Sequence, residues 1–180
     1  MVFLQGCTSN KFVASELIQE DLKLTGTNIV AYNMLDIRAG ELSHQMLGSL
    51  NRQLISEFEK RNVDAVVREF RRSDAGTAYV VSGSGRIPLR EFVTQYAQNE
   101  QDTSVKYRLL IIPSHMTISG AWRFFDVTWI LEEVSSDSTV WRGVSQGEHL
   151  VSWNIDEMYE ARASQIVESL FAELERSNMF

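Results

Sequence analysis

The sequence predicts an α/β (α+β) domain: a mixed sheet of five or six strands with an early βαβ unit, a late antiparallel hairpin and three packing helices. Three observations support this prediction. Glu41–Arg61 has apolar residues at helical spacing and lies between two apolar segments. Trp122–Glu133 alternates in polarity and is followed by a polar turn. The segment from about Ile155 to Arg176 has an apolar stripe typical of a packed helix.

Composition and charge indicate one folded domain that does not bind nucleic acid. The chain has 180 residues, of which 44% are hydrophobic and 23% charged, which is ordinary for a globular protein. The net charge of -7 disfavours binding to phosphate backbones. No run of about 18 apolar residues is present, so no membrane-spanning helix is expected. We predict a single domain over residues 15–180, preceded by a short polar tether over residues 1–14.

The first half of the chain predicts a strand–helix–strand unit. A short helix, capped by Ser15 and broken by Gly26, is expected to come first. Asn28–Leu35 is mostly apolar and predicts a central strand. Glu41–Arg61 is the first long helix, and Val63–Phe70 predicts the next strand. This spacing predicts a right-handed crossover in which the two strands are parallel.

The middle of the chain predicts a short strand, a helix and a further strand. Thr77–Val81 is the expected short strand. Pro88 suits the first turn of a helix that runs to about Gln98. Tyr107–Ile112 is an apolar strand that we expect to end at Pro113.

The clearest hairpin of the sequence joins Trp122–Glu133 to a returning strand at Thr139–Ser145. Asp126 is expected on the solvated face of the first strand, and Glu132 and Glu133 as charges at the hairpin end. One face of the first strand is apolar and predicts burial of Phe125, Val127, Trp129 and Leu131.

The amino terminus contains Leu4-Gln5-Gly6-Cys7, which resembles the lipobox of bacterial lipoproteins. In that pattern a small residue precedes a cysteine whose thiol accepts a diacylglycerol group. A signal peptide needs a basic start and an apolar stretch of about 7–15 residues. The interpretation therefore requires sequence upstream of Met1. The alternative is that Cys7 is an ordinary small apolar residue near a frayed terminus. Thr8, in place of an aspartate, favours the outer membrane in enteric-type sorting.

No catalytic motif or metal site is predicted. His44, His115 and His149 lie far apart in the sequence, and no cofactor is expected. The glycine loop Gly83-Ser84-Gly85 is neither a nucleophile elbow nor a P-loop. Gly85 and Arg86 are candidates for anion binding at a helix start, with a plain turn as the simpler interpretation.

The basic residues around Arg68 form a candidate interaction surface. Arg68, Arg71 and Arg72 follow each other closely at the end of a predicted strand. They also fit a solvated rim on an edge strand, and the sequence does not separate these two interpretations.

The chain resembles small envelope lipoproteins of Gram-negative bacteria. Their α/β domain is similar to the TolB amino-terminal domain, to the curli-secretion lipoprotein CsgG and to lipoprotein activators of penicillin-binding proteins. The resemblance implies an accessory protein, without catalytic residues, that is often oligomeric. It rests on Leu4-Gln5-Gly6-Cys7, Asn28–Leu35 with Glu41–Arg61, Tyr107–Pro113, Trp122–Ser145 with its Val140-Trp141-Arg142-Gly143 return strand, and the last helix.

The leading hypothesis is therefore a lipid-tethered periplasmic accessory, assembly or activator protein, anchored to the outer membrane through Cys7. It would act by binding an envelope protein, with a homo-oligomer as a further option. A second hypothesis is a small-ligand-binding domain or unrecognised enzyme, with a polar pocket near Arg86, Asp126 or His115. A third is a cytoplasmic oligomer subunit in which Cys7 has no role.

Overall fold

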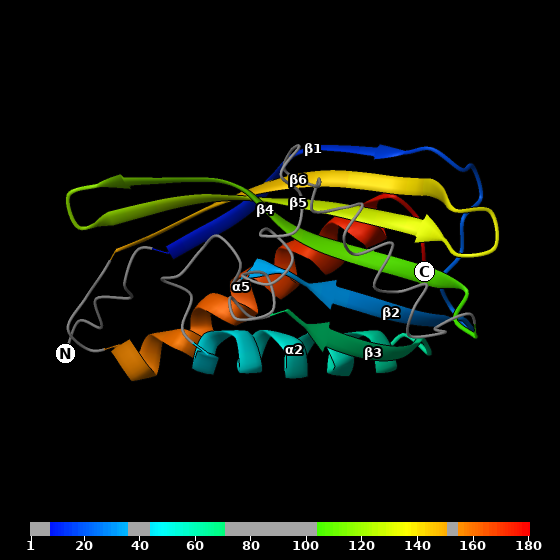
Figure 1. The fold of residues 1–180 in the computed structure, drawn as a ribbon, viewed down its shortest axis with the longest axis horizontal. Helices are drawn as coiled ribbons and strands as arrows, with labels where there is room; N and C mark the ends of the chain where they lie inside the picture. The colour runs from blue at the N-terminus through cyan, green and yellow to red at the C-terminus, as the bar shows by residue number, and fades with distance from the viewer. Residues whose placement is uncertain (1–7, 36–43, 71–103, 151–154) are drawn as a thin grey trace, which may run out of the picture.

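The computed structural model describes residues 8–35, 44–70, 104–150 and 155–180. These residues form a six-stranded mixed sheet in the order β1-β6-β5-β4-β2-β3, packed by two long helices (Figure 1). The predicted fold class is thereby confirmed. The expected strand Thr77–Val81 and the helix from Pro88 lie outside the described residues. The elements are β1 (Thr8–Leu17), β2 (Asn28–Asn33), α2 (His44–Glu59), β3 (Asp64–Glu69), β4 (Tyr107–Ser119), β5 (Trp122–Glu133), β6 (Ser138–Leu150) and α5 (Ile155–Arg176).

The early βαβ unit consists of β2, α2 and β3. β2 is the central parallel strand and pairs with both β3 and β4. α2 packs against α5 and β3, and its apolar positions recur every four residues. Met46, Leu50, Leu54 and Phe58 are all buried at these positions. The predicted parallel pairing of the strands around this helix is confirmed.

The second half of the chain is a meander of three long antiparallel strands. β5 and β6 form the predicted hairpin, but β6 continues to Leu150, five residues beyond the expected end. β4 likewise continues through Pro113 to Ser119. A register shift between Pro113 and His115 accommodates the proline, which cannot donate to the ladder. Gly120, with a φ of 60°, turns the chain from β4 into β5.

The amino-terminal segment is part of the sheet, which corrects two expectations. Thr8–Leu17 form β1 and pair antiparallel with β6, so Ser15 does not cap a helix and residues 8–14 are not a tether. The Phe12 ring packs 6.2 Å from Trp129 and 6.0 Å from Trp141, measured between ring centroids. Pairing with β6 and this aromatic contact outweigh the local helix propensity.

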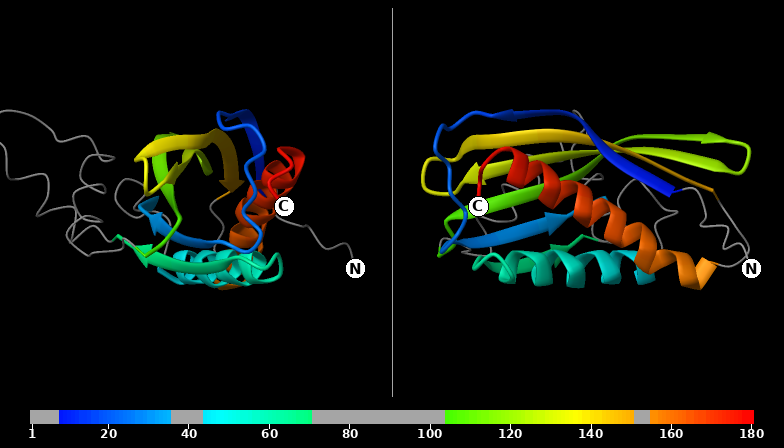
Figure 2. Two further views of the ribbon diagram at one scale, coloured as in Figure 1. Left: turned by 90° about the vertical axis from the view of Figure 1, so that its right-hand side faces the viewer. Right: turned by 180° about the vertical axis from the view of Figure 1, so that it is seen from behind.

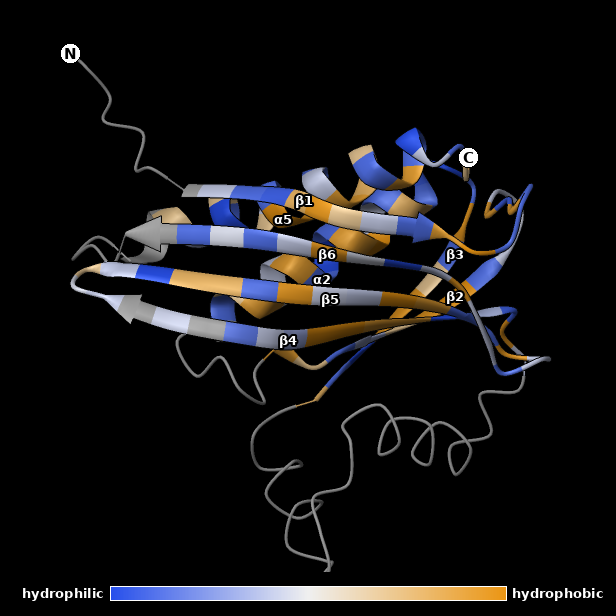
Figure 3. Ribbon diagram, turned by 90° about the horizontal axis from the view of Figure 1, so that it is seen from above, coloured by the Kyte–Doolittle hydropathy of each residue, from blue (hydrophilic) through white to orange (hydrophobic). Residues whose placement is uncertain are grey.

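The main core lies between α2, α5 and the face of the sheet that they cover (Figure 2). Trp129 and Trp141 are fully buried there. A smaller cluster lies on the opposite face, which we call the outer face. This smaller cluster contains Val30, Tyr32, Met34, Phe70 and Leu110. The outer face is therefore apolar over β2, whereas polar residues line it over β1, β6 and β5. Figure 3 shows the sheet from above, coloured by the hydropathy of each residue.

Neither described helix is both long and apolar enough to cross a bilayer.

Candidate functional site

The outer face carries two rows of polar side chains across four strands. Strand register aligns one residue each from β1, β6, β5 and β4. Because side chains alternate between the faces of a strand, all of these residues point away from the helices. The first row is Lys11, Gln146, Asp126 and His115. The second row is Ser9, Glu148, Phe124 and Thr117.

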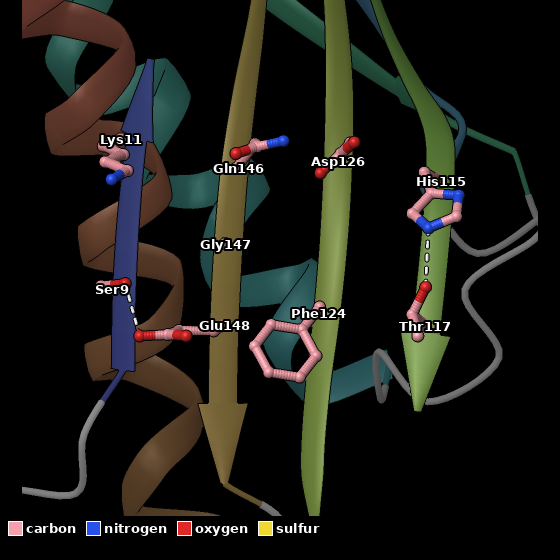
Figure 4. A pocket seen from close by; sticks show the side chains of 9 residues that line it. All are labelled: Ser9, Lys11, His115, Thr117, Phe124, Asp126, Gln146, Gly147 and Glu148. Carbon is pink, nitrogen blue, oxygen red and sulfur yellow. Dashed lines mark hydrogen bonds between the residues drawn. The ribbon is translucent and has the colours of Figure 1, made fainter. Parts of the chain in front are cut away.

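These two rows line a groove of about 460 Å³, which we call the outer groove (Figure 4). Gly147 adds backbone to its floor. The outer groove brings together side chains from four strands. Two further hollows lie elsewhere, one between α2 and α5 and one over β1, β6 and β5 that contains the Arg142–Glu16 ion pair.

Few hydrogen bonds join the side chains of the outer groove. His115 Nε2 lies 2.6 Å from Thr117 Oγ1, and Ser9 Oγ donates to Glu148 Oε1 at 3.3 Å. Both bonds are drawn in Figure 4. Within the part of the chain that the structure describes, the side chains of Lys11, Gln146 and Asp126 form no hydrogen bond or ion pair. Their side chains keep their donors and acceptors for water or a ligand.

An aromatic surface borders the groove on β5. Phe124 is 37% exposed, whereas Phe125, the next residue, is buried on the helix side. The Trp122 ring stacks on the Phe124 ring, with the two centroids 6.4 Å apart. Glu148 lies directly across from Phe124 in the ladder, and Asp126 follows two positions along the strand. Phe124 therefore lies next to two acidic residues in the ladder, of which Glu148 has its carboxylate bonded to Ser9 on β1.

The outer groove contains one hydroxyl next to an imidazole, because His115 Nε2 lies 2.6 Å from Thr117 Oγ1. Among the described residues, no group of three or more His, Cys, Asp or Glu side chains could hold a metal ion. The groove contains no thiol, and its one serine, Ser9, donates to a carboxylate and has no base beside it. Its charges are those of Lys11, Asp126 and Glu148, all reachable from solvent.

The structure brings two of the three residues named for a ligand pocket together. Asp126 and His115 are direct partners in the β4–β5 ladder and line the same groove. Asp126 lies on the outer face with Trp122 and Thr128, as predicted. Arg68 is exposed on the edge strand β3. Cys7, Gly85, Arg86, Arg71 and Arg72 lie outside the described residues.

Sequence reasoning missed the β1 and β6 sides of the groove. Lys11 was assigned to the tether, and Gln146 and Glu148 lie beyond the expected end of the returning strand. The polar alternation of Gln146 and Glu148 with Gly147 was the available signal. His149 pairs with Thr8 at the end of the sheet.

One of the two charges expected at the hairpin end is buried. Glu132 is 1% exposed and pairs across the ladder with Arg108, which is also buried. Arg108 Nε lies 3.7 Å from Glu132 Oε2, and Arg108 Nη2 lies 3.3 Å from Asp137 Oδ1. Burial of a carboxylate requires such compensation, so Glu132 has a structural role rather than one in solvent.

Comparisons with known proteins give structural likeness only. No protein-family model and no curated protein matches the sequence. The PelC dodecamer from Paraburkholderia phytofirmans is 11% identical, covers 91% of this chain and 97% of that chain, and has a TM-score of 0.45. Lipoprotein GNA1162 from Neisseria meningitidis is 11% identical, with coverages of 83% and 99% and a TM-score of 0.43. The hypothetical protein CT253 from Chlamydia trachomatis is 9% identical, with coverages of 83% and 96% and a TM-score of 0.45.

Proposed function

We propose that this chain is a non-catalytic accessory protein of the bacterial cell envelope that is tethered through Cys7 and acts by binding another protein. The observation that carries the proposal is the position of β1. Among the described residues this ten-residue strand pairs with β6 alone, and none of them pairs with its other edge. Free strand edges are templates for pairing with a partner chain.

The surface of β1 supports a binding role. Val13 is 48% exposed and Ile18, just after the strand, is 47% exposed. Val13 lies at the register shift between Phe12 and Ala14. Such a bulge divides the edge and limits unspecific pairing. The strand thus offers apolar contacts and backbone groups in two short stretches, as expected for a selective edge.

The lipobox pattern supports location in the envelope. Cys7 immediately precedes Thr8, the first residue of β1. A lipid on Cys7 would therefore hold the domain close to the bilayer, because one residue spans less than about 4 Å. The same short spacing would hold the start of the free edge at the membrane surface.

Two measurements test the two halves of this proposal. Expression in a Gram-negative host with the native upstream DNA, followed by intact-mass analysis, tests the tether. We expect a chain that starts at Cys7 with added acyl mass, and none in Cys7→Ala. An unmodified chain in the cytosol would overturn the envelope location.

Photo-crosslinking in the same cells tests the free edge. A photoreactive residue at Val13 should form a discrete adduct with one protein, which is then identified by mass spectrometry. The matched control is Asp137, an exposed residue of the turn that joins β5 to β6. Equal labelling at both positions, or none at Val13, would contradict a role for the edge.

A further inference from the structure

Two charges of opposite sign, Lys11 on β1 and Asp126 on β5, lie on opposite sides of the outer groove. Glu148 lies on β6 between these strands, and its carboxylate accepts a hydrogen bond from Ser9 on β1. Two strand spacings separate the backbones of Lys11 and Asp126, which is about 10 Å. Both side chains rise from the same face, and Gln146 lies between them (Figure 4). The groove is therefore polarised and suits a ligand that carries both charges.

The negative side of the groove is suited to an amine. Phe124 exposes its ring beside Glu148 and Asp126, and Trp122 extends the aromatic surface. A cation over an aromatic face is stabilised by the ring quadrupole, and nearby carboxylates add charge-assisted hydrogen bonds. The Asp126 side chain forms no hydrogen bond or ion pair with the described residues, so binding an amine breaks no existing side-chain bond.

The positive side of the groove is suited to an anion attached to that amine. Lys11 is exposed and forms no ion pair with any described residue. Its ammonium group has three donors on a flexible stem, which suits a phosphate oxygen. The Gln146 amide lies beside it and can donate to the same group. An anion without an amine would be repelled by the two carboxylates. An amine without an anion would be repelled by Lys11.

The groove lies at the end of the sheet where the tether begins. Thr8 pairs with His149, which pairs with Arg123, and this row lies next to that of Ser9. Figure 3 shows the start of β1, the end of β6 and the β4–β5 turn at this same end. With Cys7 lipidated, the outer groove would therefore lie near the lipid headgroups.

From these observations we propose that the outer groove binds the zwitterionic phosphoethanolamine headgroup of a membrane lipid. The amine binds between Phe124, Asp126 and Glu148, and the phosphate binds Lys11. The membrane as the source of the headgroup rests on the proposed tether at Cys7. The chemistry of the groove does not rest on the tether, because the register of four strands brings its residues together.

Soluble headgroups test the chemistry of the site without any membrane. Glycerophosphoethanolamine is titrated into the isotope-labelled full chain, and backbone amide shifts of residues in the two rows are followed by NMR. Ethanolamine and glycerophosphoglycerol serve as probes that carry only one of the two groups. We expect shifts confined to the groove and affinity for the zwitterion at least about tenfold above that for either single-charge probe, which equals about 1.4 kcal/mol.

Charge variants then assign each half of the headgroup. Asp126→Asn should weaken binding of glycerophosphoethanolamine and of ethanolamine by about tenfold or more. Lys11→Gln should weaken binding of the zwitterion but strengthen that of ethanolamine, because repulsion of the amine is removed. Glu16→Gln, on the same face of β1 but in the hollow beside Arg142, should change affinity less than about twofold. Equal binding of all three probes, or equal effects of the three variants, would overturn the proposal.

Vesicles test the source of the headgroup. Cys7 is the only cysteine, so the protein can be coupled by its thiol to a maleimide lipid. Attached in this way, the protein should protect its groove amides from hydrogen exchange on phosphatidylethanolamine vesicles more than on phosphatidylglycerol vesicles. Binding of the soluble headgroup without this protection would assign the site to a free zwitterion and overturn the lipid source. Neither result depends on lipidation in cells, so the failure of the proposed tether is recognised separately.

Discussion

Phe125 and Gly147 lie directly opposite each other in the β5–β6 ladder, and the Phe125 ring occupies the space that a side chain at position 147 would need. A Cβ atom built on Gly147 would lie 2.1 Å from the ring carbon Cζ of Phe125. Glycine at this position therefore lets an aromatic ring cover the backbone of the neighbouring strand.

Gly147→Ala is expected to destabilise the protein by about 1–3 kcal/mol, because the Phe125 ring must leave its position on a buried face. Chemical denaturation measures the change in unfolding free energy. Gly48→Ala is the matched control: its Cβ would meet only the Arg52 side chain at 3.6 Å, and alanine favours a helix by up to about 1 kcal/mol. In the background of Phe125→Leu, the cost of Gly147→Ala should shrink. An unchanged cost in that double variant would show that the ring is not the cause.

The parts of the fold that could be predicted from the sequence are those whose apolar pattern matches their own period. The α2 and α5 stripes and the alternation in β5 are of this kind, because each element buries one face against the same core. β1 could not be predicted in this way. Its register includes a bulge at Val13 that interrupts the alternation, and its stability depends on β6, which lies more than 120 residues away along the chain.

The outer groove could be predicted only in part for the same reason. The sequence places Asp126 in a mostly apolar strand, whereas His115 lies beyond the expected end of the Tyr107–Ile112 strand. Their proximity depends on the register shift after Pro113, which no local pattern specifies. Lys11 joins them only because β1 extends the sheet beyond β6. Residues that meet through long-range strand pairing are the ones that sequence reasoning leaves apart.

A second prediction concerns the buried hydrogen bond between Trp129 and Ser145. Trp129 Nε1 donates to Ser145 Oγ at 2.9 Å, and both residues are fully buried. Ser145→Ala leaves the indole N–H without an acceptor, so we expect a loss of about 1–3 kcal/mol in unfolding free energy. Ser164→Ala is the matched control, because Ser164 donates to Glu168 on the exposed side of α5 and should change stability by less than about 0.5 kcal/mol.

The double variant distinguishes loss of this bond from loss of packing. Trp129→Phe removes the donor together with part of a ring, and its own cost is large. If the unsatisfied N–H causes the effect, Ser145→Ala should cost much less in the Trp129→Phe background than alone. Additive costs in the thermodynamic cycle would assign the effect to the lost hydroxyl volume.

A third prediction concerns Glu173, through which α5 is joined to β1. Its carboxylate accepts from Arg176 Nε at 3.0 Å and from the Ser15 hydroxyl. Burial raises the pKa of Glu173, but the bonds from Arg176 and Ser15 lower it by more, so the pKa lies below its ordinary value of 4.5. The ionised form is thus favoured in the folded state. The stability that it contributes is present above the pKa of the unfolded chain and is lost as pH falls through the lower folded pKa.

Glu173→Gln is therefore expected to lose roughly 1–2 kcal/mol of unfolding free energy at pH 7, and the difference from the unmodified protein should disappear in acid. Denaturant titrations at a series of pH values between 7 and 3 measure it. Ser15→Ala keeps the carboxylate and Arg176 but removes one donor, so its curve should lie between the other two. A difference that stays constant over the whole pH range would mean that Glu173 joins α5 to β1 by shape and neutral hydrogen bonding, and that its charge contributes nothing.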